Sequence, residues 1–200
     1  GGALLKWFRD AFASADRRSL EAGQDIYDAL AAEMPSEPTR LLTLPYFEMT
    51  GPPQFVADAA GAIVGLKTST TRGEILRSIM ECETFYFVDS LERLKELRVD
   101  SSEFVATGGG AKSDAWLQIK ADILGVPFAR PRILECSALG AAILAGWATG
   151  VFSSPKEGVE RFVAIDRVFE PNPARHETYR DLCQKYRQLY PALENLLKQL

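Results

Sequence analysis

The residues best suited to chemistry form a glycine-rich turn, Gly108-Gly109-Gly110, near the middle of the chain. An apolar stretch at residues 104–107 precedes the turn, and a helical pattern begins at Asp114. Glycine has no Cβ, so a ligand can approach its backbone closely, and positive φ angles are accessible to it. A helix start presents unpaired N–H groups and a partial positive charge. The segment therefore suits the polyphosphate or ribose of a nucleotide.

The turn matches neither of two common nucleotide-binding motifs. It is neither GxGxxG nor GxxxxGK[ST], so the dinucleotide and P-loop patterns do not apply. On these residues alone, a tight strand-to-helix turn without a ligand remains an equal alternative. Lys112 could contact a phosphate, although a lysine near a helix start is more often simply solvated. Ser113 or Asp114 is expected to cap the helix that follows.

Helices and short strands must position this turn, and their alternation along the chain predicts an α/β fold. Apolar residues at helical spacing predict helices at residues 3–13, 24–33, 71–97, 114–124, 136–149 and 176–200. Short apolar or extended runs predict strands at residues 41–47, 62–67, 104–107 and 126–129. No internal repeat or linker is visible, so residues 1–200 are interpreted as one domain.

The composition is that of a globular protein with a sizeable core. Of its 200 residues 46% are hydrophobic and 25% are charged, and the net charge of −4 gives no overall basic surface for nucleic acid. No apolar run approaches the roughly 20 residues that span a bilayer. Cys82, Cys136 and Cys183 are far apart, and together with a single histidine they form no metal-binding pattern. We expect reduced thiols, no protein-held metal, no membrane association and a cytoplasmic location.

Further residues follow the turn in a recognisable order. They are Ser113, Trp116, Gln118, Ala121-Asp122, Gly125-Val126-Pro127, Glu135, Ala138 and Gly140-Ala141-Ala142. This block resembles the C-terminal signature of the FGGY family of carbohydrate kinases. Residues 44–47 and 61–81 are similar to two other segments of that family, in the same order. Together these matches cover most of residues 1–150.

The resemblance implies an actin-like (ribonuclease H-like) ATPase fold, with helices packed on a short-stranded mixed sheet. In this family two domains flank a cleft, and a hydroxyl of a sugar (ketose) or polyol takes the γ-phosphoryl group of ATP, with Mg²⁺ on the phosphates. The chain would be the C-terminal, nucleotide-binding half of such a kinase. In this family the catalytic base and the sugar-contacting residues lie in a part of the sequence that would precede the first residue of this chain. No catalytic residue is therefore assigned, and the isolated chain is expected to be inactive.

The resemblance also assigns six residues to the nucleotide. They are Gly2, Lys6, Gly109, Gly110, Ala111 and Asp114. Asp114 would face the adenine, where relatives have asparagine, and relatives have glutamine in place of Lys6. We expect Lys6 and Asp114 to line one pocket from opposite sides and to be able to form an ion pair when it is empty. Replacing Gly110 with valine should weaken ATP binding and leave thermal stability nearly unchanged.

Two other functions remain open on the sequence. The chain could be a non-catalytic actin-like nucleotide-binding module, or a structural, dimerising domain. The long apolar pattern at residues 176–200 gives a homodimer some support, because an amphipathic helix can pack on a partner. The loop at residues 48–53 departs from the family pattern, so its role stays open. An upstream half with an aspartate-containing glycine-rich turn would favour the kinase.

Overall fold

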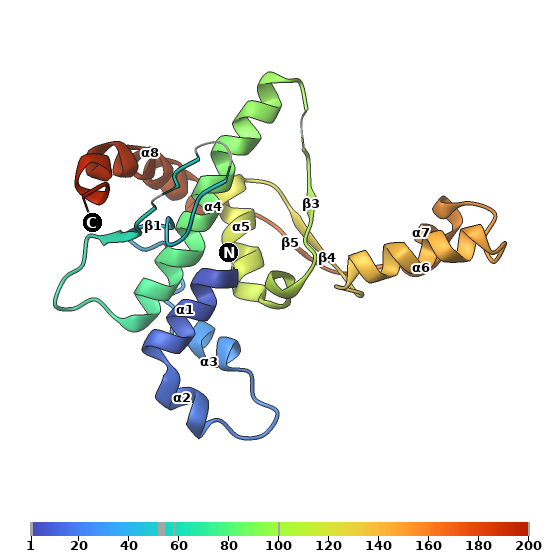
Figure 1. Cartoon of the computed structure of the whole chain (residues 1–200), viewed down its shortest axis with the longest axis horizontal. Coiled ribbons are helices and arrows are strands. Elements are labelled where there is room, and N and C mark those ends of the chain that lie inside the picture. Colours follow the sequence, from blue (N-terminus) through green and yellow to red (C-terminus); the bar gives the residue numbers. More distant parts are fainter. Residues whose placement is uncertain (1, 52–54, 58, 100, 200) are drawn as a thin grey trace.

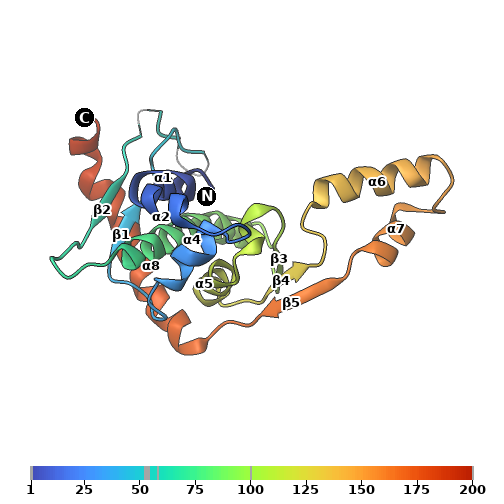
Figure 2. The same ribbon diagram turned by 90° about the horizontal axis from the view of Figure 1, so that it is seen from below.

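The computed structural model describes residues 2–51, 55–57, 59–99 and 101–199, so the loop predicted at 48–53 lies partly outside the described residues. A helical body carries two small sheets and a long projection (Figures 1 and 2). One sheet pairs β1 (Leu42–Leu44) with β2 (Ala62–Val64) in antiparallel fashion. In the other, β4 (Phe128–Pro131) lies between parallel β3 (Phe104–Val105) and antiparallel β5 (Ile165–Phe169).

The helices match the predicted ones closely. In chain order they are α1 (Gly2–Phe12), α2 (Ser14–Ser19), α3 (Ile26–Ala32), α4 (Arg72–Glu96), α5 (Asp114–Leu124), α6 (Cys136–Ala148), α7 (Pro155–Phe162) and α8 (Pro173–Leu197), with the 3₁₀ turn η1 at Gly109–Lys112. The sequence analysis missed α2, α7 and β5. Helix α2 and strand β5 are mostly exposed and carry no strong hydrophobic period, whereas α7 is amphipathic but only eight residues long.

Helix α4 lies at the centre of the body and begins at a capping box. The Thr71 hydroxyl accepts a hydrogen bond from the backbone N–H of Glu74 (3.2 Å), and the Glu74 carboxylate accepts one from the N–H of Thr71 (2.7 Å). Gly73 lets the first turn of α4 press against the backbone of Glu33 at the end of α3, since a Cβ there would collide with the Glu33 carbonyl. The local sequence therefore fixes the start of α4, and Gly73 permits its close contact with the end of α3.

The main core surrounds α4 and is built from α1, α3, β1, α5 and α8. Its fully buried members include Phe8, Leu30, Leu44, Ile79 and Ile119. The apolar face of α8 packs into this core. Its buried residues are Tyr179, Leu182, Cys183, Tyr186, Leu189 and Leu197. This face is therefore used within the chain, which removes the support that the C-terminal helix gave to a homodimer.

A polar network is buried inside this core. The Glu81 carboxylate accepts hydrogen bonds from Arg77 Nε (2.8 Å), the Tyr179 hydroxyl (2.8 Å) and the Thr39 hydroxyl (2.7 Å). The Tyr179 hydroxyl in turn accepts one from Arg77 Nη2 (2.8 Å). The Glu81 side chain is only 1% exposed, so each of these bonds replaces lost water. The network ties α8 to α4 and to the segment before β1.

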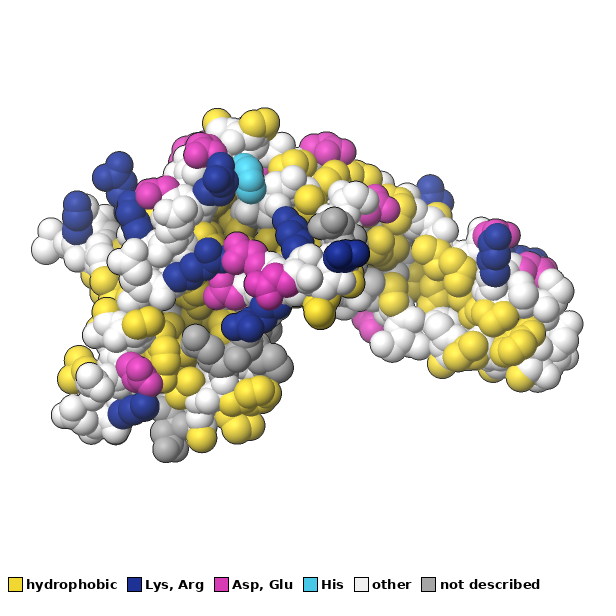
Figure 3. Space-filling model, turned by 90° about the horizontal axis from the view of Figure 1, so that it is seen from above, with side chains coloured by type: hydrophobic (Ala, Val, Ile, Leu, Met, Phe, Trp, Pro, Cys, Tyr) yellow, Lys and Arg dark blue, Asp and Glu magenta, His cyan; other side chains and the backbone are white. Residues whose placement is uncertain are grey.

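Helices α6 and α7 and the turn between them, residues 136–162, form an arm that extends from β4 and β5 away from the body (Figures 1 and 2). Hydrophobic side chains gather on the arm, at the right of Figure 3. A second apolar cluster lies where the sheet of β3, β4 and β5 meets α5. Within the described residues, no helix combines the length and apolar character of a membrane span.

Candidate nucleotide site

The glycine turn connects β3 to α5 through η1. Gly108 has a φ of +76°, a conformation that favours glycine, and its N–H donates to the carbonyl of Leu134 (3.0 Å). A Cβ on Gly109 would meet nothing within 4 Å. A Cβ on Gly110 would lie 3.2 Å from Cζ3 of Trp116. The open side of the turn is therefore at Gly109, whereas Gly110 packs against the indole.

This contact changes the expectation for Gly110. The sequence predicts that replacing Gly110 with valine weakens ATP binding and leaves thermal stability nearly unchanged. Because the new side chain would press on Trp116, a residue only 6% exposed, the substitution should also strain the protein. Gly109 is the better position for testing ligand approach.

The helix after the turn begins and ends as its sequence indicates. The Ser113 hydroxyl accepts a hydrogen bond from the N–H of Trp116 (3.2 Å), so Ser113, not Asp114, is the N-cap. Gly125 closes α5 in the left-handed region with a φ of +67°. The first turn of α5 is thus held firmly beside η1, with the helix N-terminus next to the glycines.

A pocket of about 330 Å³ opens beside the turn, between α4, β3, η1 and α5. Gly110, Ala111, Trp116, Lys120 and Glu83 are among its lining residues. Lys120 Nζ lies 4.6 Å from the centroid of the Trp116 ring, a cation–π contact. Burial lowers the pKa of Lys120, while the charge of Glu83 acts in the opposite direction. The pocket thus combines backbone groups, an aromatic face and a half-buried cation.

Lys120 was missed by the sequence analysis. It stands four residues after Trp116 on α5, so the two side chains share one face of the helix. This spacing was the available signal, but a lysine on an amphipathic helix is usually solvated. The indole N–H of Trp116 is buried and has no hydrogen-bond partner among the described residues. The ammonium group of Lys120 in this pocket favours a ligand that carries acceptor atoms.

Asp114 is paired with arginines. Its carboxylate contacts Arg130 Nη1 (2.5 Å) and Arg167 Nη1, and both guanidinium groups lie over the ring of Phe169. The hydrogen bond to Asp114 raises the pKa of Arg130. The ion pair expected between Asp114 and Lys6 is therefore absent from the described residues.

The start of α1 lies close to the glycine turn, as Figures 1 and 2 both show. Glu83 of α4 connects the two regions, because it lines the pocket beside Gly110 and also a second hollow that Ala3 and Leu4 line. Gly2 and Lys6 are exposed and four residues apart on α1, so they share one face. The structure thus places α1 and the turn on either side of Glu83. The assignment of the six residues to a nucleotide stays a prediction.

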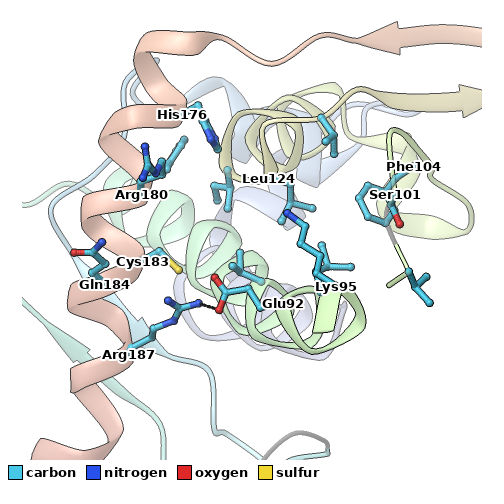
Figure 4. A pocket seen from close by; sticks show the side chains of 16 residues that line it. Glu92, Lys95, Ser101, Phe104, Leu124, His176, Arg180, Cys183, Gln184 and Arg187 are labelled. Atoms are coloured by element: carbon cyan, nitrogen blue, oxygen red, sulfur yellow. Dashed lines mark hydrogen bonds and ion pairs between the residues drawn. The ribbon is translucent and has the colours of Figure 1, made fainter. Parts of the chain in front are cut away.

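Another pocket, of about 340 Å³, lies between the C-terminal part of α4, the end of α5 and α8, and its lining contains no residue of the glycine turn (Figure 4). Its lining includes His176, Cys183 and Lys95. Arg187 also lines it but is already paired with Glu92 and Asp89. Across the part of the chain that the structure describes, no group of three or more histidine, cysteine, aspartate or glutamate residues is placed to hold a metal ion. Cys82, Cys136 and Cys183 are free thiols in the structure.

The class of protein, an actin-like ATPase domain, follows from the solved sugar-kinase structures that the fold matches, and the small mixed sheet with helices packed on it agrees with that class. The family follows from comparison with known proteins. The model of the FGGY family of carbohydrate kinases, C-terminal domain, matches residues 1–149. The chain therefore belongs to this family, and the predicted family and fold class are confirmed.

The similar proteins are kinases. A glycerol kinase of Ralstonia nicotianae is 36% identical over 192 residues, which are 92% of this chain and 36% of that protein. A xylulose kinase of Staphylococcus epidermidis is 32% identical over 199 residues, 100% of this chain and 38% of that protein. The crystal structure of a xylulose kinase from Rhodospirillum rubrum matches with a TM-score of 0.77 and 30% identity, over 98% of this chain and 39% of that one. The chain thus spans less than two fifths of these curated relatives.

Proposed function

We propose that the parent protein transfers the γ-phosphoryl group of ATP to a hydroxyl group of a sugar or polyol, and that this chain supplies the nucleotide side of the cleft. Membership of the FGGY family supports the reaction class. The relatives include a glycerol kinase and a xylulose kinase, so a polyol and a ketose both stand as acceptors.

The observation that carries the proposal is the open face of the glycine turn at the start of α5. The N–H groups and dipole of a helix start favour the ribose or phosphates of a nucleotide. Nothing lies within 4 Å of the position that a Cβ on Gly109 would take, so a ligand could contact the backbone there. Lys120, in the adjoining pocket, would supply a positive charge. These groups position a nucleotide without taking part in bond making.

Asp114 would act at the adenine. Each carboxylate oxygen can accept more than one hydrogen bond, and each has one arginine partner here. The remaining lone pairs can accept from the adenine amino group, as the asparagine of relatives would. Arg130 and Arg167 would then hold the carboxylate in place. An aspartate at position 114, where relatives have asparagine, is therefore compatible with binding of the adenine of ATP.

Mg²⁺ would accompany the nucleotide. Magnesium usually keeps several waters and binds through one or two carboxylates together with substrate phosphates, so it does not require a dedicated cluster of protein ligands. The described residues contain no such cluster. When bound, the ion neutralises phosphate charge. This chain's own share is to bind and orient the base, the ribose and the phosphates.

An assay of ADP release by the full-length protein tests the proposal. The panel contains glycerol, xylulose, other ketoses and other polyols, and the isolated 200-residue chain is measured beside the full-length protein. We expect acceptor-dependent ADP release by the full-length protein and none by the chain, because positioning both substrates can supply roughly 7 to 11 kcal/mol of the barrier. A full-length protein that binds ATP but phosphorylates no member of the panel would favour a non-catalytic nucleotide-binding module.

A further inference from the structure

The pocket between the C-terminal part of α4, the end of α5 and α8 takes no part in the proposed nucleotide site (Figure 4). Helices α4 and α8 each run for 25 residues, whereas α5, which packs against both, has 11 residues and ends where Gly125 takes a φ of +67°. The space past the end of α5 is therefore left open between the two longer helices. Its volume of about 340 Å³ lies within the range of small-molecule sites, roughly 300 to 1,000 Å³. We call this space the α4–α8 pocket.

Much of the lining of this pocket is apolar. The apolar lining includes Val88, Leu91, Phe104, Ile123 and Leu124. His176 of α8 also lines the pocket and is held in place, because its Nδ1 donates a hydrogen bond to the carbonyl of Asp122 near the end of α5 (3.0 Å). An apolar group that covers these side chains is removed from water together with them, which favours binding. The pocket therefore suits a ligand with an apolar body.

The charged side chains of the lining are mainly basic, although the chain as a whole carries a net charge of −4. Arg187 is already paired with Glu92 and with a second carboxylate of α4. Arg180 of α8 is paired with Glu177 (3.0 Å), but both side chains are well exposed, so this pair contributes little and exchanges easily. Lys95 of α4 forms no ion pair with any residue that the structure describes, and Figure 4 shows it extending toward the end of α5. Two cations on facing helices are thus available to a ligand.

We propose that the α4–α8 pocket binds a small organic anion. Its oxyanion head group pairs with Lys95, Arg180 adds positive potential from the facing helix, and its apolar body covers the apolar lining. Ammonium and guanidinium groups donate hydrogen bonds and accept none, so they select carboxylate or phosphate oxygens. Phe104 and Leu124 line both this pocket and the one beside the glycine turn, so they form a wall between the two. A test must therefore distinguish binding at Lys95 from binding at Lys120 on the other side of that wall.

Calorimetric titration of the full-length protein tests this proposal. The probe is hydrocinnamate, a carboxylate on a phenyl-bearing chain, and its neutral amide is the matched ligand without charge; ionic strength is held constant. Lys95→Gln removes the proposed cation. Lys185→Gln removes the same charge from an exposed position on α8 that does not line the pocket and serves as the control. We expect hydrocinnamate to bind at least about fivefold more tightly than the amide, and only Lys95→Gln to remove this preference.

Two native thiols give an independent measurement of where the probe binds. Cys183 lines the α4–α8 pocket, whereas Cys136, at the start of α6, does not. A ligand in the pocket blocks the approach of a labelling reagent to Cys183. Saturating hydrocinnamate should therefore slow the labelling of Cys183 at least about threefold and leave that of Cys136 unchanged. Mass spectrometry of peptides gives both rates in one sample at one fixed pH.

Three results would overturn the proposal. The first is no binding of hydrocinnamate up to about 20 mM. The second is an equal loss of affinity in Lys95→Gln and Lys185→Gln, which would show attraction by surface charge in general. The third is binding that Lys120→Gln removes and Lys95→Gln leaves intact, which would place the anion beside the glycine turn. None of these measurements uses ATP or an acceptor sugar, so their outcome is independent of the proposed phosphoryl transfer.

Discussion

Two tyrosines of α8 provide a controlled test of the buried network. Tyr179 and Tyr186 are 1% and 5% exposed, and both rings contact Phe85, with centroids 6.0 and 5.6 Å from it. They differ in their hydroxyl groups. The Tyr179 hydroxyl bonds to Arg77 and Glu81 at 2.8 Å each. The Tyr186 hydroxyl is buried and, within the described ranges, has no hydrogen-bond partner.

Replacing each tyrosine with phenylalanine removes only the oxygen atom. Tyr179→Phe breaks two hydrogen bonds to charged groups and leaves a buried guanidinium and a buried carboxylate each short of one partner. A hydrogen bond to a charged group contributes about 1.5 to 3 kcal/mol, so we expect a total loss of about 3 kcal/mol. For a chain of this size that loss corresponds to a fall in Tm of roughly 6 to 12 °C. Tyr186→Phe removes an unsatisfied hydroxyl and should be neutral or slightly stabilising.

Guanidinium denaturation of both variants and the unsubstituted protein measures the difference, with the m-value as a check that the unfolding transition is unchanged. Tyr179→Phe should shift the midpoint strongly and Tyr186→Phe should not. Equal free energies of unfolding for the two variants would show that the network of Arg77, Glu81 and Thr39 does not depend on the Tyr179 hydroxyl. The link between α8 and α4 would then rest on apolar packing alone.

Two further predictions concern backbone contact and thiol chemistry. Gly73→Ala should lower the free energy of unfolding by about 1 to 3 kcal/mol, because the new methyl group collides with the Glu33 carbonyl and must push α4 away from α3. Thermal unfolding measures this loss. An unchanged Tm would contradict the close contact. Burial raises the pKa of the Cys183 thiol to about 11, so the thiolate fraction is small at pH 8. Labelling of Cys183 should therefore accelerate about tenfold per pH unit up to about pH 11, whereas a plateau near pH 9 would show an ordinary thiol.

The elements that the sequence predicts well are those whose ends are set by residues close by in the chain. Thr71 and Glu74 start α4, and Ser113 and Gly125 bracket α5, through hydrogen bonds within a few residues. Strand β5 has no such local signal, since four of its five residues are exposed. It becomes a strand by pairing with β4, a contact between distant parts of the chain.

The candidate site also contains parts that the local sequence predicts and parts that depend on tertiary contacts. The glycine turn and the helix after it are visible in the sequence because a single local segment forms them. The pairing of Asp114 with Arg167 joins residues 53 positions apart, and it replaced the partner expected at Lys6. The position of Glu83 between α1 and the turn likewise depends on how α4 packs. Such contacts are set by tertiary structure, and no spacing rule predicts them.

The most direct test of the nucleotide site is the steady-state kinetics of full-length protein carrying Gly109→Val. The side chain enters open space in this structure, so the Tm should stay near that of the unsubstituted protein. If the backbone at Gly109 contacts ATP, the KM for ATP should rise at least about tenfold, equivalent to about 1.4 kcal/mol. The KM for the sugar or polyol should change little and serves as the internal control. A folded Gly109→Val protein with an unchanged KM for ATP would contradict the assignment of the glycine turn to the nucleotide.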